Sequence, residues 1–398
     1  GGLALLEKSI PALKLSRPAA LLSFAGSLVL LAQIYPELIS SGPISYNVGG
    51  WDSVIAIHLS LDGLALIASV IIQIIGFVCL LYFIKDKQYD PGFIFFYMIM
   101  TAGMEGVVQS LDIFNLFVFL EIIGITAYIL VAYLKKGPAL VASLKYLILS
   151  SLAMAFYLIG VLFLYRYTGS FHLEVIGKHI SQHPSLLQDG PLLFAFVFLI
   201  VGIGTRTAFV PFHTWLPDAH GNAPHPVSAI LSGVMIKVAF IALWRIVSAV
   251  SDPRFSSLLL WLGSISAVIT VINALAQSDL KRLLAFHSVS QMGFILAAFG
   301  AASAGPVLAG SAHIAALYHS LSHAFFKALL FLTIGGVIFI SGERDYRKIS
   351  GIAKQKPLLF IVFIVGALSI SGVPPFNGFI SKKLVFSAVK PFHLPYAL

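Results

Sequence analysis

Long apolar runs, separated by short polar stretches, dominate the pattern of hydrophobic and polar positions along the chain. A helix that spans a membrane needs about 20 consecutive apolar residues. Segments of roughly this length are predicted at 18–38, 61–84, 93–110, 113–134, 140–165, 191–212, 226–250, 257–276, 287–303, 313–340 and 357–390. The pattern therefore predicts an all-α polytopic membrane protein.

Two of these segments carry prolines that predict interrupted helices. In the sixth, FVPFHTW places Pro211 where it removes a backbone donor and clashes with the preceding turn. The eleventh contains Gly372 followed by Pro374 and Pro375. Freed backbone groups at membrane depth are tolerated only against protein or a water-filled cavity. The breaks lie an odd number of segments apart, which predicts inverted repeats of the kind found in transporters.

Lysine and arginine are unevenly divided between alternate loops, and this division predicts the orientation of the chain. One set of loops carries only Arg166, Lys178 and Arg254. The other set carries Lys8, Lys14, Arg17, Lys85, Lys87, Lys135, Lys136, Lys281, Arg282, Arg344, Arg347, Lys348, Lys354 and Lys356. The richer side is predicted to be cytoplasmic, together with residue 1, and Leu398 is predicted near the opposite face.

The composition agrees with this class and excludes several others. The chain is 59% hydrophobic and 10% charged, whereas a soluble domain carries about 25% charged residues. A single cysteine, Cys79, excludes a disulfide framework, a Cys-based zinc site and an iron–sulfur cluster. No Gly-rich nucleotide loop is present, so no cofactor is predicted, although contact with quinone stays open. The net charge of +9 lies mostly in one set of loops and does not indicate nucleic-acid binding.

Ionisable residues inside the apolar segments are the first candidates for function, because such a charge costs roughly 3 kcal/mol on insertion scales. Glu121 lies mid-way along the fourth segment, where burial suits a carboxyl group to proton exchange. The alternative is a structural salt bridge. Lys237 lies at the centre of the seventh segment, where burial favours an amine that releases its proton. Arg206 stays protonated, so it is predicted to hold Glu121 ionised or to gate the path.

The tenth segment carries a second group of candidates. His319, His323 and Lys327 recur every four residues and therefore share one helix face. Histidine titrates near neutrality and suits a proton relay. Two histidines four residues apart also suit a metal, but no HExxH pattern or nearby carboxylate completes such a site, so no metal is predicted. Lys382 and Lys383 flank the second break, one expected to face the path and the other the interface.

The remaining polar residues leave alternatives open. Glu105 has no clear role, Asp112 is either functional or a helix cap, and Lys145 is expected to snorkel. His287 and Gln291 are expected to extend a hydrated path. Three histidines of the loop after the first break are either solvated or placed at a channel entrance, namely His213, His220 and His225.

Four stretches together resemble a known family: FNLFVFLE, VPFHTWLPDAH, SDLKRLLAFHSVSQMG and SHAFFKALLFL. They are similar to the antiporter-like membrane subunits shared by respiratory complex I, Mrp-type cation/proton antiporters and membrane-bound hydrogenases. The similarity covers nearly the whole chain, and DIFNLFVFLEI looks most like the D-type subunit of Mrp antiporters. The stretch HSLSHAFFKALLFL is also similar to the largest such complex I subunit, so the member stays open.

The resemblance implies inverted five-helix repeats with two discontinuous helices. It implies N-terminal transmembrane helices over 1–92, a first repeat over 93–250 with a break near 206–212, and a second over 257–398 with a break near 372–382. The second repeat would be incomplete, with one family helix before residue 1 and two after residue 398. Family positions fall on Glu121, Lys237, His319, His323 and Lys382. Arg206 stands where the family has lysine, a departure from the pattern.

The resemblance also implies a function. The chain is expected to be a multi-pass plasma-membrane subunit of a larger complex that moves protons along Glu121, Arg206, Lys237, His319, His323, Lys327 and Lys382. Cation (Na⁺)/proton antiport is the first hypothesis. The alternative is a proton-pumping subunit of complex I, the NADH-quinone oxidoreductase, or of a hydrogenase, with electron transfer in other subunits. Other membrane subunits, lipid, protons and Na⁺ are the expected partners, and which complex contains the chain stays open.

Overall fold

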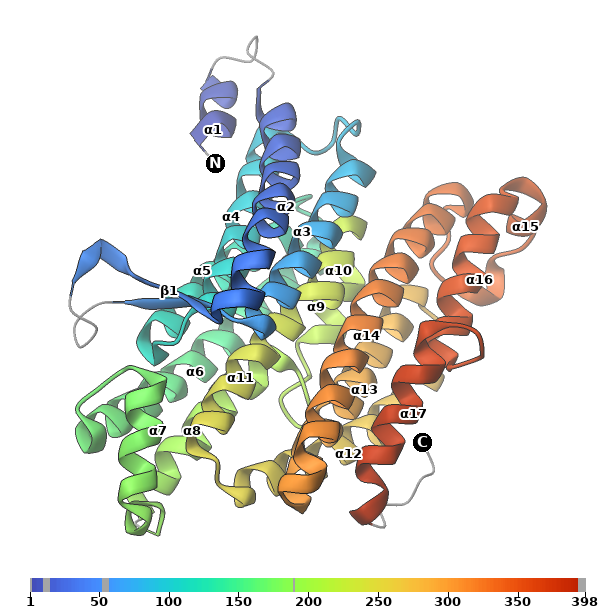
Figure 1. Cartoon of the computed structure of the whole chain (residues 1–398). Helices are drawn as coiled ribbons and strands as arrows, with labels where there is room; N and C mark the ends of the chain where they lie inside the picture. Colours follow the sequence, from blue (N-terminus) through green and yellow to red (C-terminus); the bar gives the residue numbers. More distant parts are fainter. Residues whose placement is uncertain (1, 10–14, 52–56, 189, 393–398) are drawn as a thin grey trace. The chain divides into compact units, whose positions relative to one another are not determined.

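The computed structural model describes residues 2–9, 15–51, 57–188 and 190–392 (Figure 1). Within these ranges, ten helical segments are long and apolar enough to cross a membrane, and the shorter apolar helix Pro357–Ser371 follows them. The predicted fold class, an all-α polytopic membrane protein with two interrupted helices, is confirmed. Lys14 and Leu398, which were assigned to opposite faces, lie outside the described residues.

The chain divides into two compact units, each built from separate stretches. The first unit comprises Gly1–Tyr133, Ser143–Arg206 and Val238–Ser251, and the second comprises Leu134–Ala142, Thr207–Lys237 and Asp252–Leu398. The proposed division into an N-terminal region and two repeats follows other boundaries and stays a prediction.

The first unit contains most of the N-terminal helices. They are α1 (Gly2–Ser9), α2 (Ser16–Ser41), α3 (Gly63–Phe83), α4 (Pro91–Gln109), α5 (Ile113–Val131), most of α6 (Gly137–Thr168), α7 (Leu173–Gln182), nearly all of α8 (Gly190–Thr207) and most of α11 (Ile236–Val250). Strands β1 (Ile44–Asn47) and β2 (His58–Leu61) form a short antiparallel hairpin that the sequence analysis did not predict. Short 3-10 turns occupy Val48–Gly50 and Pro184–Leu187.

Aspartates begin three consecutive helices of this unit. Asp62, Asp90 and Asp112 accept hydrogen bonds from the backbone N–H groups of Ala65, Phe93 and Asn115, at 2.8, 3.0 and 2.7 Å. Such bonds satisfy donors that the first helical turn leaves unpaired. The helix-capping alternative for Asp112 is therefore the correct one.

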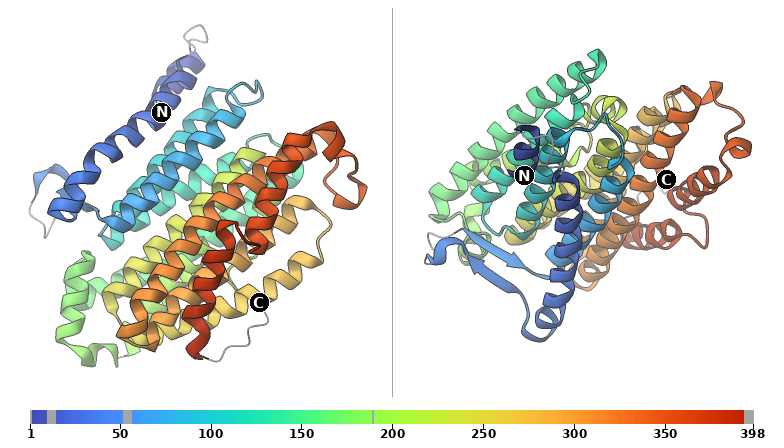
Figure 2. Two further views of the ribbon diagram at one scale, coloured as in Figure 1. Left: turned by 45° about the vertical axis from the view of Figure 1, so that its right-hand side comes forward. Right: turned by 90° about the horizontal axis from the view of Figure 1, so that it is seen from above.

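The second unit is a bundle around α13 and α14. Its helices are α9 (Leu216–Asn222), α10 (His225–Ile230), α12 (Pro253–Leu275), α13 (Leu280–Gly300), α14 (Pro306–Ser341), α15 (Ile352–Gln355), α16 (Pro357–Ser371) and α17 (Asn377–Val389). Short 3-10 turns occupy Ala301–Ala304, Tyr346–Lys348 and Lys390–Phe392, and a π-helical turn occupies Leu231–Met235. Helix α14 packs against α13, α16 and α17, as both views of Figure 2 show.

The two predicted breaks share one geometry. Helix α8 ends at Thr207, four residues before Pro211, and α16 ends at Ser371, four residues before Pro375. A proline ring clashes with the carbonyl group four residues earlier, so each helix ends where that clash would begin. Both prolines follow a cis peptide bond. In Figure 1 the second break is the loop between α16 and α17.

Two basic loops of the second unit meet the loop after the first break at one end of the bundle. Arg344 forms an ion pair with Asp279, 2.8 Å between Nε and Oδ2, and also donates to the backbone oxygen of Gly221. Arg282 lies 3.5 Å from Asp218. The loops after the sixth, eighth and tenth segments therefore share one side of the bundle, as the alternation of basic loops requires. Which side faces the cytoplasm stays a prediction.

Candidate functional site

Glu121 and Arg206 form an ion pair between α5 and α8. The Nη2 atom of Arg206 lies 2.5 Å from the Oε1 atom of Glu121, and the Arg206 and Glu121 side chains are 3% and 25% exposed respectively. The sequence predicted a buried carboxyl group at Glu121, with Arg206 as a possible countercharge. Glu121 is instead a quarter exposed, and it is paired with the guanidinium group at the end of α8. The predicted countercharge is therefore present.

One face of α5 receives the guanidinium group. Glu121, Gly124 and Tyr128 share this face at helical spacing. A Cβ atom added at Gly124 would overlap with Nη1 of Arg206, so only glycine leaves room for the group in this position. The guanidinium carbon also lies 5.9 Å from the centre of the Tyr128 ring, within the range of cation–π attraction. Tyr146 of α6 packs edge-on against Tyr128, with ring centres 4.6 Å apart.

Lys237 lies in the second unit, directly after the π-helical turn. Its side chain is 7% exposed, and its Nζ atom donates to the backbone oxygen of Ser232, inside that turn. A π turn is wider than an α turn and occurs frequently at functional sites. The oxygen of Ser232 thereby serves as an acceptor for a buried ammonium group.

Hydroxyl groups continue from this turn to a second buried lysine. The Ser232 and Ser288 hydroxyl oxygens lie 2.7 Å apart. Ser288 donates to the backbone oxygen of Leu284 at 2.9 Å, so Ser232 must donate to Ser288. The same oxygen of Leu284 accepts from Nζ of Lys327 at 2.6 Å, and Lys327 is fully buried. Side-chain and backbone groups therefore connect Lys237 with Lys327.

His319 and His323 of α14 lie on one helix face, as predicted, and both are fully buried. The rings of His319 and His323 are nearly parallel, with centres 6.4 Å apart. The Ser381 hydroxyl donates to the oxygen of Gly378 at 3.1 Å, so the Nδ1 atom of His319, 3.0 Å from that hydroxyl, must be the donor. Nε2 of His319 is then the nitrogen that is free to accept a proton. Neither nitrogen of His323 has a hydrogen-bond partner within the described part of the chain.

The second break places Lys382 and Lys383 differently. Lys382 is partly buried and its Nζ lies 5.6 Å from the centre of the Phe294 ring, while Lys383 is exposed. Phe294 also packs edge-on against His319, with ring centres 5.8 Å apart. Of the two lysines, Lys382 is therefore the one on the side of the buried histidines.

For His220, in the loop after the first break, the predicted alternative of a solvated side chain is wrong. His220 is not solvated: it is fully buried between the rings of Trp215 and Phe331, at 6.1 and 5.9 Å between ring centres. The loop folds back as helix α9 against α13, and this packing covers His220. His213 and His225 are partly buried. Neither nitrogen of His220 has a hydrogen-bond partner within the residues that the structure describes.

Sequence reasoning missed a second ion pair of the first unit. Arg245, in α11, donates to both carboxylate oxygens of Asp62 at 3.0 and 3.1 Å and to the backbone oxygen of Val108 at 2.8 Å. An arginine inside an apolar segment was the available signal. In the same unit, Glu105 accepts hydrogen bonds from Ser69 and Gln73 at 2.5 and 2.7 Å, which gives this carboxylate polar partners.

Known proteins share this sequence and fold. The family model described as "NADH:quinone oxidoreductase/Mrp antiporter, TM" matches residues 110–396. The chain is 37% identical to the N-type subunit of NADH-quinone oxidoreductase from Desulforudis audaxviator, over 92% of this chain and 72% of that protein. It is 31% identical to the D-type subunit of a Na(+)/H(+) antiporter from Alkalihalophilus pseudofirmus, over 89% of this chain and 72% of that protein.

The chain belongs to this NADH:quinone oxidoreductase/Mrp antiporter family. A chain in the structure of the membrane-bound sulfane sulfur reductase, an archaeal respiratory membrane complex, superimposes with a TM-score of 0.88 at 28% identity, covering 97% of this chain and 78% of that one. A chain of the Mrp complex from Dietzia sp. DQ12-45-1b superimposes with a TM-score of 0.87 at 25% identity. The match covers 98% of this chain and 72% of that one. The predicted family is therefore confirmed, and the chain is an integral polytopic membrane protein.

Proposed function

We propose that this chain is an ion-translocating membrane subunit of a multisubunit complex and that it moves protons. Among such complexes, we favour a Na⁺/proton antiporter of the Mrp type. Proton transfer inside a membrane needs groups that can gain and lose a proton without contact with bulk water. The observation that carries the proposal is the set of buried bases in the second unit, Lys237, His319, His323 and Lys327, none more than 7% exposed.

The chemistry of these bases supports a relay. Each lysine donates to a backbone oxygen, and among the described residues neither forms an ion pair with a carboxylate. Nε2 of His319 is free to accept, and the unpartnered nitrogens of His323 lie beside it on the same helix face. Lys382 adds a further amine near Phe294 at the second break. Protons would then pass between amine and imidazole groups through transient water.

Glu121 and Arg206 would act as the regulating pair of the first unit. Arginine does not release its proton under physiological conditions, so Arg206 serves as a fixed positive charge. Protonation of Glu121 changes the charge of the pair, and charge is poorly screened at membrane depth. We propose that this change biases the proton affinity of Lys237.

The test uses the assembled complex in everted membrane vesicles. A pH-sensitive dye reports proton movement after addition of Na⁺, in the absence of any electron donor. The proposal requires dye responses from the wild-type chain and none from Lys237→Ala at equal assembly. Transport at the wild-type rate in the Lys237→Ala protein would overturn it.

A second candidate is proton pumping driven by electron transfer in other subunits. The 37% identity to a NADH-quinone oxidoreductase subunit and the close superposition on a respiratory membrane complex support it. The same vesicles distinguish the two. Proton movement that needs an electron donor and ignores a Na⁺ gradient favours this second function.

The partners and location follow from the same relatives. Several of them are subunits of multisubunit membrane complexes, so we propose that this chain assembles with other membrane subunits. We propose the plasma membrane as its location, with Na⁺ as the exchanged cation.

A further inference from the structure

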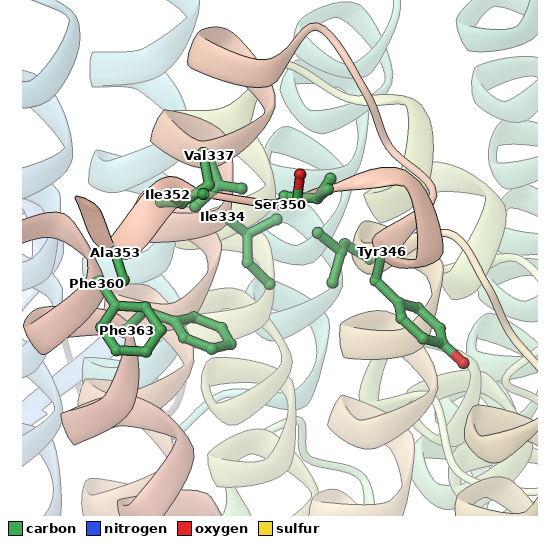
Figure 3. A pocket seen from close by; sticks show the side chains of 11 residues that line it. Ile334, Val337, Tyr346, Ser350, Ile352, Ala353, Phe360 and Phe363 are labelled. Atoms are coloured by element: carbon green, nitrogen blue, oxygen red, sulfur yellow. The ribbon is translucent and has the colours of Figure 1, made fainter. Parts of the chain in front are cut away.

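A cavity of about 290 Å³ lies at one end of the second unit, between α14 and the segment that leads into α16. In Figure 3 its walls come from Ile334 and Val337 of α14, Ile352 at the start of α15, and Phe360 and Phe363 of α16. These side chains are apolar. The volume lies just below the range of roughly 300–1,000 Å³ that is typical of pockets for drug-sized molecules. An apolar lining of this kind suits a hydrocarbon group better than a polar ligand.

The cavity continues onto a surface that is built to face lipid. Phe360 lines the cavity and is also 39% exposed. Leu358 and Ile361, its neighbours on α16, are 73% and 57% exposed, and Phe339 at the same end of α14 is 86% exposed. Exposed apolar side chains at this density belong in hydrocarbon rather than water. An acyl chain could thus enter the cavity sideways from the bilayer.

Polar groups mark the other edge of the cavity. The side chains of Tyr346 and Ser350 belong to the lining of the cavity. In Figure 3 the hydroxyl of Tyr346 points away from the apolar lining side chains. Tyrosine is enriched at the level of lipid headgroups, where its ring is apolar and its hydroxyl is wet. This edge therefore lies at the membrane–water boundary.

Lysines flank the lining residues along the chain. Lys348, Lys354 and Lys356 are exposed, and they border the lining stretch 349–353. Arg347 is different, because Asp345 holds it in an ion pair at 2.6 Å and the pKa of that carboxyl is lowered to about 2 by the same arginine. The three lysines are therefore exposed basic residues next in sequence to the lining of an apolar cavity. Basic pockets at the predicted cytoplasmic side attract anionic lipid headgroups.

We propose that this cavity binds one acyl chain of an anionic phospholipid, whose phosphate group is held by Lys354 and Lys356. The occupant follows from the two halves of the site. An apolar cavity open to the bilayer takes a hydrocarbon chain, and adjacent lysines select a negatively charged headgroup over a zwitterionic one. The lipid would join the end of α14 to the first half of the second interrupted helix.

The experiment uses the full-length protein in its complex, reconstituted in phosphatidylcholine bilayers. Phe360→Trp places a fluorophore in the cavity wall, and the native tryptophans are subtracted with the unsubstituted protein. Brominated phosphatidylglycerol and brominated phosphatidylcholine are added at equal mole fractions. We expect quenching of the new tryptophan to show a severalfold preference for phosphatidylglycerol. The preference should disappear in the additional variant Lys354→Gln/Lys356→Gln, since both lysines are exposed and their loss leaves the packing intact.

Phe339→Trp is the matched control, because this residue faces the bilayer at the same end of α14 but does not line the cavity. It should be quenched equally by both lipids. If both brominated lipids quenched the tryptophan of Phe360→Trp equally, the cavity would contact only the surrounding bilayer lipid without selecting it. That result would overturn the proposal. Absence of quenching by either lipid would mean that protein, from another helix or subunit, covers the cavity, and would also overturn it. Neither result bears on proton transport.

Discussion

Arg206 and Glu121 meet with 2.5 Å between Nη2 and Oε1, and this contact joins the last turn of α8 to the middle of α5. The pair lies at the point where the first interrupted helix ends, one residue before Thr207. Burial of the guanidinium group makes the interaction strong, because little water remains to screen it. The contact between Arg206 and Glu121 therefore depends on where α8 ends.

Removal of the carboxylate charge should stop transport. Glu121→Gln keeps the shape of the side chain but cannot exchange a proton, so we expect transport to fall by roughly 10²-fold, the usual contribution of a proton-transfer group. Dye-based vesicle assays at equal assembly measure the loss. Glu174→Gln, at an exposed position of α7, is the control and should leave the rate unchanged. A normal rate in the Glu121 variant would exclude this residue from the path.

Substitution of Lys237 separates a proton carrier from a fixed charge. Lys237→Arg keeps the positive charge but not the ability to release a proton, so we expect it to be as inactive as Lys237→Ala. Rates are compared in the same vesicles across a range of pH. If the arginine variant transports normally, Lys237 acts only as a fixed charge.

Arg206 should be needed for transport as the partner of Glu121. Arg206→Lys retains a positive charge and should be tolerated. Arg206→Gln leaves Glu121 without a positively charged partner, so we expect it to transport more slowly than the Lys variant in the same vesicles. Breaking a buried pair costs about 3–5 kcal/mol, so the Gln variant should also unfold more readily. A wild-type rate in the Gln variant would show that the pair takes no part in transport.

Gly124 should be needed for the same contact. Alanine at this position would bring its Cβ atom into overlap with Nη1 of Arg206 and force the guanidinium group away from α5. We expect Gly124→Ala to lower the rate of transport, as Arg206→Gln does. Gly26→Ala, where no atom lies within 4 Å of the added carbon, is the control. The double variant Gly124→Ala/Arg206→Lys should recover activity, because an ammonium group is smaller than a guanidinium group.

The ion pair of Asp62 and Arg245 should contribute to stability rather than to transport. Asp62→Asn keeps an oxygen that can cap α3 but removes the negative charge beside a buried arginine. We expect a loss of about 3 kcal/mol in the free energy of unfolding. Thermal unfolding of the purified complex measures it. A drop in transport without any loss of stability would assign the pair to the ion path instead.

The sequence predicted the interrupted helices and pointed to the candidate residues because these residues stand out locally. Pro211, Pro375, Glu121 and Lys237 are each unusual inside an apolar helix. Arg245 is unusual in the same way, but its partner Asp62 could not be predicted, since 183 residues separate the two and only the packed unit brings them together. His220 was also beyond prediction, because its neighbours are Gly, Pro and Asn, which are typical of exposed loops.

The π-helical turn before Lys237 also lies outside sequence reasoning, since LSGVM is compatible with an ordinary α-helix. A π turn contains one residue more than the α turn it replaces. If the same residues were wound as a regular α-helix, the extra residue would no longer be absorbed within one turn, and Lys237 would turn by about 100° relative to α10. The amine would then leave the oxygen of Ser232 and face a different part of the bundle. The position of this lysine thus depends on the winding of the backbone as much as on the identity of the residue.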